Sequence, residues 1–194
     1  MSPAPTRSTA RRTRRALARG GVALATGLLL ATGLTTSAQA ADGRSPVPAP
    51  GAGDHRANAE VLDETCVVPS THDPAITAIA YDVAMSRGVT EKVLLSLFEA
   101  GWVESHFNNL DCGDSDSVGY LQQRPSQGWG TPEQCMDPVH ATNAYLDQAI
   151  PNDVNNPGYT AGQLAQSVQR SAFPERYDQA EAKARELIAE AQAG

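Results

Sequence analysis

Apolar residues recur at helical spacing through the C-terminal two thirds of the chain, and no stretch alternates apolar and polar residues as a half-buried strand does. Asp73 and Thr90 are typical N-cap residues, Pro138 suits the first position of a helix, and Thr160 forms a capping box with Gln163. We therefore expect a mainly α domain. Its predicted helices span residues 74–87, 91–105, 138–150, 161–171 and 174–188, and Pro151 is expected to stop the third.

The helix over 91–105 places a glutamate on its apolar side. On a helical wheel of about 100° per residue, Glu104 falls about 20° from Val93, within the apolar arc. A carboxyl group held against apolar surface keeps its proton to a higher pH, which makes Glu104 a candidate general acid. The alternative is a helix-end carboxylate satisfied by a neighbouring backbone group. Glu99 falls about 240° from Val93, on the side where a hydrated surface carboxylate is expected.

Residues 1–40 have the pattern of a secretory signal peptide. They carry six arginines and no acid, continue into a short apolar run, and end in Ala38-Gln39-Ala40. The apolar run is too short for a stable membrane span. Residues 41–63 are rich in Pro, Gly and Ala, which predicts a disordered linker, and residues 64–194 fit one domain. We expect a secreted protein, located outside the cell or in the cell wall.

The charge of the chain argues against a nucleic-acid partner. Its formal net charge is −7, and without residues 1–40 it has 9 Lys and Arg against 22 Asp and Glu, a net charge of −13. Binding to nucleic-acid phosphates requires clustered Lys and Arg. We therefore expect no nucleic acid among its partners.

All three cysteines lie after the predicted signal peptide, where thiols can oxidise. Cys112 and Cys135 bracket the Asp-rich loop and the segment after it, so we predict a disulfide between them. Cys66 is then free or links two chains, although three cysteines also allow it to pair with either of the others.

The other polar residues predict no metal site and no cofactor. His106 and His140 lack the carboxylate or cysteine neighbours of a zinc site, and the acidic turn over 111–116 misses the spacing of a calcium-binding EF-hand. Asp114 and Asp116 remain candidates for a second acid beside Glu104.

Three groups of residues resemble one superfamily. Glu104-Ser105 precedes an Asn-containing turn, the run GYLQQ occupies 119–123, and the run MDPVHATNAYL occupies 136–146. Together they resemble the lytic transglycosylase and goose-type lysozyme superfamily. More narrowly, the run GYLQQRPSQGWGTPEQ over 119–134 and the run QSVQRSAFPERY over 166–177 resemble small secreted actinobacterial proteins with a lysozyme-like domain. The superfamily's later Ala-Tyr-Asn motif is missing, and residues 167–173 stand in its place.

The resemblance implies a single lysozyme-like helical domain that binds peptidoglycan glycan strands, with Glu104 as the catalytic acid and Gln122 on the substrate side. Trp129 is a candidate for stacking on a sugar ring, with a role as a core anchor as the alternative. The predicted substrate-binding residues are Ser105, Tyr120, Gln122, Gln123, Trp129 and Tyr145.

We therefore expect a secreted peptidoglycan glycosidase in which Glu104 is general acid and then general base. The resemblance favours the lytic transglycosylase route, in which the C6 hydroxyl of the sugar attacks and gives a 1,6-anhydro product. Hydrolysis with Asp114 or Asp116 is the alternative route. A protein of another class, which binds wall glycan or a protein partner without cleaving it, is the alternative function, and the missing Ala-Tyr-Asn motif favours it.

Overall fold

Helices make up most of the regular structure, as the sequence predicts. The computed structural model describes residues 49–62 and 66–194, which belong to one compact unit, Asp42–Gly194. The predicted signal peptide and the rest of the predicted linker lie outside the described residues. Within them, β-structure is limited to two isolated bridges. The elements are α1 (Pro74–Ser86), α2 (Glu91–Ser105), the 3₁₀ helix η1 (Pro125–Gln127), α3 (Pro132–Cys135), α4 (Pro138–Asn155), α5 (Ala161–Gln169), α6 (Glu175–Gln179) and α7 (Glu181–Ala193).

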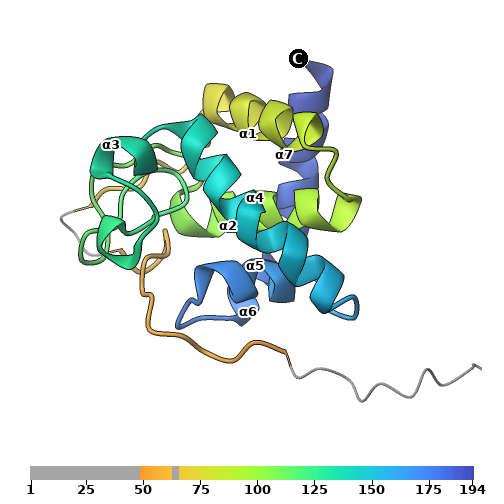
Figure 1. Cartoon of the computed structure of the whole chain (residues 1–194). Helices are drawn as coiled ribbons and strands as arrows, with labels where there is room; N and C mark the ends of the chain where they lie inside the picture. Colours follow the sequence, from red (N-terminus) through yellow and green to blue (C-terminus); the bar gives the residue numbers. More distant parts are fainter. Residues whose placement is uncertain (1–48, 63–65) are drawn as a thin grey trace, which may run out of the picture. The chain divides into compact units, whose positions relative to one another are not determined.

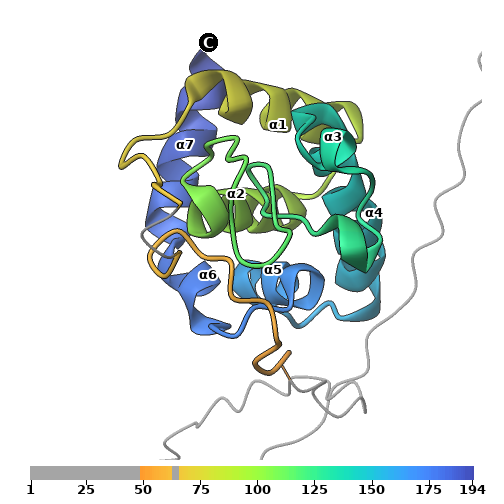
Figure 2. The same cartoon turned by 90° about the vertical axis from the view of Figure 1, so that its left-hand side faces the viewer.

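Helix α2 lies at the centre of the bundle. Four helices contact it directly, α4, α5, α6 and α7, while α1 packs across α4 and α7 (Figure 1). Figure 2 shows α2 in the middle of this ring, with α1 and α5 on opposite sides. Leu97 and Phe98 of α2 have no exposed surface and join the main apolar core. Because α2 is enclosed by its neighbours, its side chains are placed more rigidly than those of an outer helix.

Local sequence signals predicted the helix starts correctly. The side chains of Asp73 and Thr90 accept hydrogen bonds from the first turns of α1 and α2, and Thr160 with Gln163 forms the capping box of α5. Each signal acts within a few residues, so the remainder of the fold does not change it.

Two predicted helix boundaries are wrong. Pro151 lies inside α4 instead of ending it. Pro151 is exposed, so the backbone carbonyl group that loses its partner can bind water. The predicted helix over 174–188 is two helices, which meet at Ala180, a buried residue with no sequence signal for a break.

Residues 49–62, which we call the strap, pack against the helices, although the sequence predicts a disordered linker there. His55, Ala57 and Asn58 are buried. The strap's backbone forms hydrogen bonds with residues 170–172, including one from the Gly53 amide to the Ser171 carbonyl oxygen at 2.7 Å. These contacts are long-range in sequence, so the Pro, Gly and Ala content of the segment does not reveal them.

The disulfide joins Cys66 to Cys112, whose Cα atoms lie 5.5 Å apart, and Cys135 is free and buried. The predicted pairing of Cys112 with Cys135 is therefore wrong. Two side chains just after α2 hydrogen-bond to backbone carbonyl groups within residues 69–71, and these contacts hold the segment after Cys66 near the loop that carries Cys112. The cysteines' positions in the sequence do not show this proximity.

Glu99 is buried, with 1% of its surface exposed, although the helical wheel predicts a hydrated position. The wheel assumes that one side of the helix faces water, whereas α2 is surrounded. Both carboxyl oxygens lack a hydrogen-bond partner among the described residues, beside a cavity of about 330 Å³. Burial, with the charges of Asp178 and Glu181, raises the pKa of Glu99 to about 9. Glu99 is thus a neutral acid at neutral pH.

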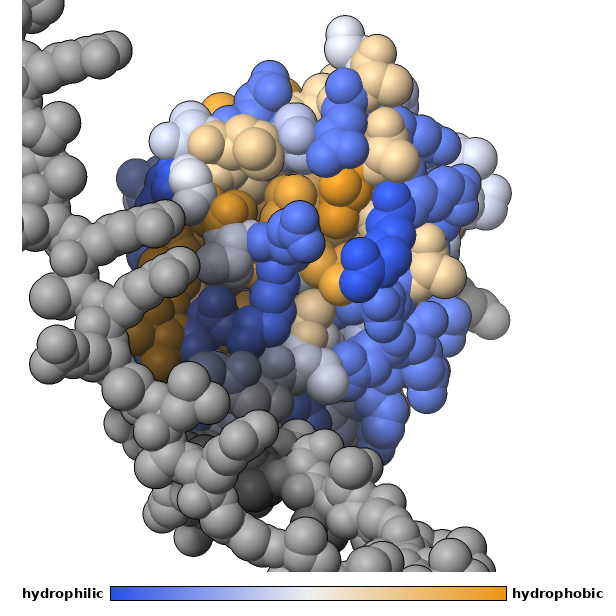
Figure 3. Space-filling model, turned by 90° about the vertical axis from the view of Figure 1, so that its right-hand side faces the viewer, coloured by the Kyte–Doolittle hydropathy of each residue, from blue (hydrophilic) through white to orange (hydrophobic). Residues whose placement is uncertain are grey.

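The surface mixes apolar and polar side chains. On the face drawn in Figure 3, apolar side chains gather in the middle, and polar ones surround and cross them. Among the described residues, no helix has both the length and the apolar character needed to cross a bilayer. The large apolar side chains that are exposed are Val61, Val67, Met85, Val139 and Val154.

We expect Glu99→Gln to stabilise the protein at neutral pH. The folded chain keeps the Glu99 proton up to about pH 9, whereas the unfolded chain releases it near pH 4.5. Between these values this group lowers the free energy of unfolding of the wild type by about 1.4 kcal/mol per pH unit. Gln does not titrate, so the variant keeps its stability as the pH rises. The difference in free energy of unfolding between variant and wild type, measured by urea unfolding, should therefore grow from about pH 5 to about pH 8.

Glu175→Gln provides the control, because it removes an exposed carboxylate from α6 and changes the net charge equally. Its effect on the free energy of unfolding should be small and should not increase between about pH 5 and about pH 8. If Glu99→Gln changed the free energy of unfolding equally at about pH 5 and about pH 8, a neutral, buried Glu99 would be contradicted.

Candidate active site

Glu104 lies in the last turn of α2 and has no exposed surface. Its Oε1 atom accepts a hydrogen bond from the Tyr177 hydroxyl group at 2.6 Å. Its Oε2 atom lies 3.3 Å from Nε2 of His55, in hydrogen-bonding and ion-pairing distance. The inward direction predicted from the sequence is thus confirmed, but the carboxyl group meets two polar partners instead of apolar surface alone.

The two partners of Glu104 are suited to a carboxylate. Burial and the nearby charge of Glu104 raise the pKa of Tyr177 well above its ordinary value, so its hydroxyl group stays protonated and donates. Burial by itself would lower the pKa of His55, but the charge of Glu104 and the hydrogen bond to it keep this pKa raised. Glu104 is therefore held at both oxygens, by α6 on one side and by the strap on the other.

The chain leaves α2 immediately after Glu104 through a tight turn. Ser105 donates a hydrogen bond from its hydroxyl group to the Tyr120 carbonyl oxygen at 2.6 Å, which ties the helix end to the following loop. His106 and Phe107 both have positive φ angles, 53° and 58°, which are unfavourable for residues with side chains. The ring of Phe107 folds back across Gly101, where an added Cβ would lie 2.5 Å from a ring carbon. This packing fixes the helix end that carries Glu104.

Five of the six predicted substrate-binding side chains face the interior. Ser105, Tyr120, Gln122, Gln123 and Tyr145 are each at most 1% exposed, so none offers a surface to a ligand in this conformation. Their polar atoms are used internally: the Tyr120 and Tyr145 hydroxyl groups bond to Thr142 and Ser96, and the Gln123 amide group donates to the Ala141 carbonyl oxygen. Ser105, Tyr120 and Gln123 join the loop over 106–131 to the helices, and Tyr145 joins α4 to α2.

Gly119 and Gln122, the first and fourth residues of the run GYLQQ, have structural roles. Gly119 has a φ angle of 80°, and an added Cβ would lie 2.2 Å from the Cys135 carbonyl oxygen. Gln122 donates from Nε2 to the carbonyl oxygens of Cys112 and Gly119, both at 3.1 Å. Its amide group therefore holds the loop that carries Cys112, and Gln122 also lines the small cavity beside Trp129.

Trp129 is the predicted sugar-contacting residue that keeps part of its surface open. It packs against the apolar core on one side, and on the other it lines a small cavity together with Arg124, Gln127, Gln169 and Arg170. The strap contributes Asp54 and His55 to the same cavity, which measures about 50 Å³. Ligand sites usually measure about 300–1,000 Å³, so the strap leaves little room in this cleft.

The two aspartates proposed as a second acid differ in their surroundings. Asp116 pairs with Arg124 at 2.9 Å, and this hydrogen bond, with those from Ser126, lowers the pKa of Asp116 to about 2. Asp114 accepts a hydrogen bond from the Arg56 amide group at 3.4 Å, and its charge acts on His55. Asp114 is therefore the aspartate that acts on His55, the partner of Glu104, while Asp116 holds the loop.

The two histidines considered for a metal site have structural contacts. His106 stacks on Trp102, with ring centroids 4.1 Å apart, and its Nδ1 atom lies 2.9 Å from the Pro69 carbonyl oxygen. Nε2 of His140 lies 3.1 Å from the Trp129 carbonyl oxygen. Within residues 49–62 and 66–194, no three His, Cys, Asp or Glu side chains cluster as metal ligands do.

Sequence reasoning missed both hydrogen-bond partners of Glu104. Tyr177 falls within the predicted helix over 174–188, where a large aromatic residue gives no sign of a polar contact. His55 was assigned to the linker, where a single histidine among small residues is the available signal. Both lie far from Glu104 along the chain, so no local motif connects them to it.

No known protein-family model matches the chain, and no functionally curated protein matches it in sequence. The function must therefore be inferred from the side chains around Glu104 and from the cleft beside them.

We expect Tyr177→Phe to lower the free energy of unfolding more than Tyr145→Phe does. The first change removes a hydrogen bond to a carboxylate, which contributes about 1.5–3 kcal/mol, and the second removes a neutral one, which contributes about 0.5–1.5 kcal/mol. Chemical denaturation of both variants at neutral pH measures the difference. Equal losses would contradict a charged Glu104 as the acceptor of the Tyr177 hydroxyl group.

Proposed function

We propose that this protein is a secreted, lysozyme-like glycosidase that cleaves peptidoglycan glycan strands, with Glu104 as general acid and then general base. The observation that carries the proposal is a buried glutamate held at both oxygens at the end of the central helix, whose partner His55 lines a small cavity with Trp129. A fixed acid beside an aromatic surface suits a sugar polymer, because sugar C–H faces pack on indole rings. The resemblance noted in the sequence points the same way.

In the proposed reaction, protonated Glu104 donates its proton to the oxygen that bridges two amino sugars while the bond from this oxygen to C1 breaks. The C6 hydroxyl group of the sugar that contains this C1 then attacks C1 through its oxygen, and the Glu104 carboxylate accepts the proton of that hydroxyl group. The products are a shortened strand and a 1,6-anhydro sugar, and Glu104 regains its proton. If water attacks in place of the C6 hydroxyl group, the product is a reducing sugar.

Tyr177 acts as a positioning residue in this proposal. Its hydroxyl group donates to Oε1 of Glu104 at 2.6 Å, which fixes the carboxyl plane and leaves Oε2 to face His55 of the strap. The proton for the substrate therefore comes from Oε2. Since Tyr177 is on α6 and Glu104 on α2, the packing of these two helices sets the direction of the acid.

The choice between the two products depends on a second acid. Asp114 is the aspartate placed to assist an attacking water, because Asp116 is paired with Arg124. Mass spectrometry of the soluble products separates the routes, since an anhydro sugar is lighter than a reducing sugar by one water. We expect anhydro products, as the resemblance implies, with Asp114→Asn cleaving as the wild type does.

The disulfide is consistent with secretion, because disulfides persist in oxidising compartments. Together with the predicted signal peptide, it supports a location outside the cell or in the cell wall. There the peptidoglycan strands would be accessible.

A binding module without catalysis is the second candidate. The observation in its favour is that most predicted sugar-contacting side chains are buried, and that Glu104 has no exposed surface. Such a protein would hold wall glycan or a protein partner through the exposed part of the cleft near Trp129.

Comparison of Glu104→Gln with Glu99→Gln on labelled peptidoglycan tests the proposal. Both changes replace a buried glutamate of α2 with an amide of the same shape. Loss of a general acid should lower the rate of product release by about 10²-fold or more. Glu99→Gln should stay within about twofold of the wild type, because the Glu99 oxygens hydrogen-bond to none of the described residues.

Full activity of Glu104→Gln would overturn the glycosidase assignment. A wild type that binds labelled peptidoglycan but releases no product under any tested condition would favour the binding module instead.

A further inference from the structure

The strap is docked on the candidate site by backbone contacts. The amide groups of Gly53 and His55 donate to the carbonyl oxygens of Ser171 and Arg170 at 2.7 and 3.3 Å, and the Ala172 amide group donates to the His55 carbonyl oxygen at 2.8 Å. His55 and Ser171 form a parallel β-bridge. This short pairing holds the His55 ring over Glu104.

The docked strap and a glycan strand cannot occupy the site together. Glu104 has no exposed surface while His55 contacts it, and the cavity that His55 lines with Trp129 measures about 50 Å³. The docked arrangement therefore describes a resting state.

We propose that the strap is a built-in inhibitor of the Glu104 site, and that residues 51–56 must swing away before a glycan strand can enter. This inference rests on the proposed function, because it concerns access to the same acid. The strap acts by covering the carboxyl group and by filling the cleft near Trp129.

The two halves of the strap are held with different strength. Residues 51–54 are exposed and bury little apolar surface; backbone hydrogen bonds and one bond from the Gln166 amide group to the Gly51 carbonyl oxygen at 2.8 Å hold them. Ala57 and Asn58 are buried, and the Arg176 guanidinium group binds Asn58 at 2.8 Å and Glu60 at 2.7 Å.

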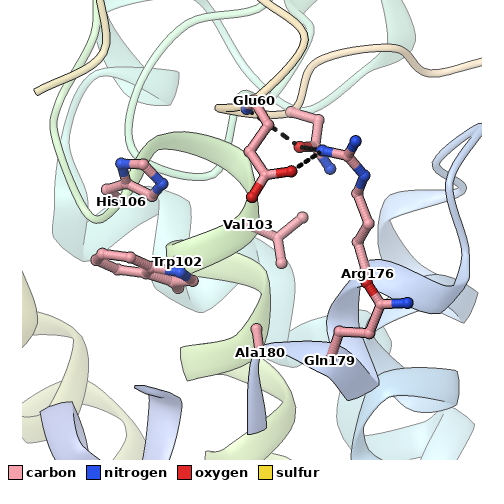
Figure 4. Close-up of a pocket in the computed structure, with 8 residues that line it drawn as sticks. Glu60, Trp102, Val103, His106, Arg176, Gln179 and Ala180 are labelled. Atoms are coloured by element: carbon pink, nitrogen blue, oxygen red, sulfur yellow. Dashed lines mark hydrogen bonds and ion pairs between the residues drawn. The ribbon is translucent and has the colours of Figure 1, made fainter. Parts of the chain in front are cut away.

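Figure 4 shows Glu60 pointing toward the Arg176 guanidinium group, next to the stacked Trp102 and His106. The disulfide at Cys66 anchors the chain shortly after the strap. Opening should therefore release residues 51–56, with the contact of His55 to Glu104 and the bond from the Arg56 amide group to Asp114, while Asn58 and Glu60 stay anchored.

Gly53 provides a specific way to open the strap. A Cβ atom added to Gly53 would lie 1.9 Å from the Arg170 carbonyl oxygen, a distance that real Cβ atoms do not reach. At Gly51, two residues earlier, an added Cβ would meet no atom within 4 Å. Gly53→Val should thus undock the strap without touching the helices, and Gly51→Val is its matched control.

The test combines activity with a direct measure of docking. Hydrogen exchange of the Ala172 amide group, read by mass spectrometry or NMR on the purified protein, reports whether the strap is docked. We expect Gly53→Val to speed this exchange and to raise the initial rate of product release from labelled peptidoglycan by about tenfold, as when the open fraction rises from about a tenth to nearly one. Gly51→Val should change neither reading.

His55→Ala separates an inhibitor from a catalytic partner. If the ring only covers Glu104, its removal should also raise the initial rate, whereas loss of a residue needed for the reaction would lower it. A lower rate for His55→Ala would overturn the inhibitory role.

The outcomes distinguish this inference from the proposed function. An active wild type with unchanged activity in Gly53→Val, whether or not amide exchange becomes faster, overturns the strap inhibitor and leaves the glycosidase in place. Absence of cleavage by the wild type, Gly53→Val and His55→Ala alike overturns the glycosidase and, with it, the inhibitor.

Discussion

The burial of one carboxyl group sets the arrangement of the candidate site. A carboxylate without exposed surface is unstable by several kcal/mol unless hydrogen bonds and an opposite charge compensate it. At Glu104 the compensation comes from the Tyr177 hydroxyl group and the His55 ring. α6 must pack directly on the end of α2, and the strap must cross the same point, for both contacts to form. The two segments thus meet at Glu104 although they lie far apart in the sequence.

The burial that stabilises Glu104 also limits what it can do. An acid enclosed by its own chain cannot protonate an external polymer, so the proposed glycosidase needs a second conformation in which the strap is displaced. The contacts of the strap are unequal along its length, which allows its first half to leave while Arg176 keeps the second half docked. The buried residues around the turn after α2 then serve as a rigid frame that stays unchanged between the two conformations.

The sequence predicted those features that depend on neighbouring residues. Helix caps and the inward direction of Glu104 follow from local spacing, and they agree with the structure. Glu99 was placed incorrectly because a helical wheel assumes one solvent-facing side, while α2 is enclosed on several sides. The strap, the disulfide of Cys66 and the contact of Tyr177 depend on which distant segments pack together, and composition and spacing carry little information on that. Most of the predicted substrate-binding side chains are buried, because they form internal hydrogen bonds that spacing along the chain does not reveal.

The pKa of His55, measured by NMR titration of the imidazole nitrogens of the four histidines, tests most directly whether the strap is docked on Glu104. In the wild type we expect His55 to titrate above the ordinary histidine value of about 6.5, because Glu104 stabilises its charged form. In Glu104→Gln the burial of the ring is no longer offset by that charge, and the pKa of His55 should fall by a measurable amount. A His55 that titrates at the ordinary value in both proteins would contradict the docked strap and the arrangement of the site built on it.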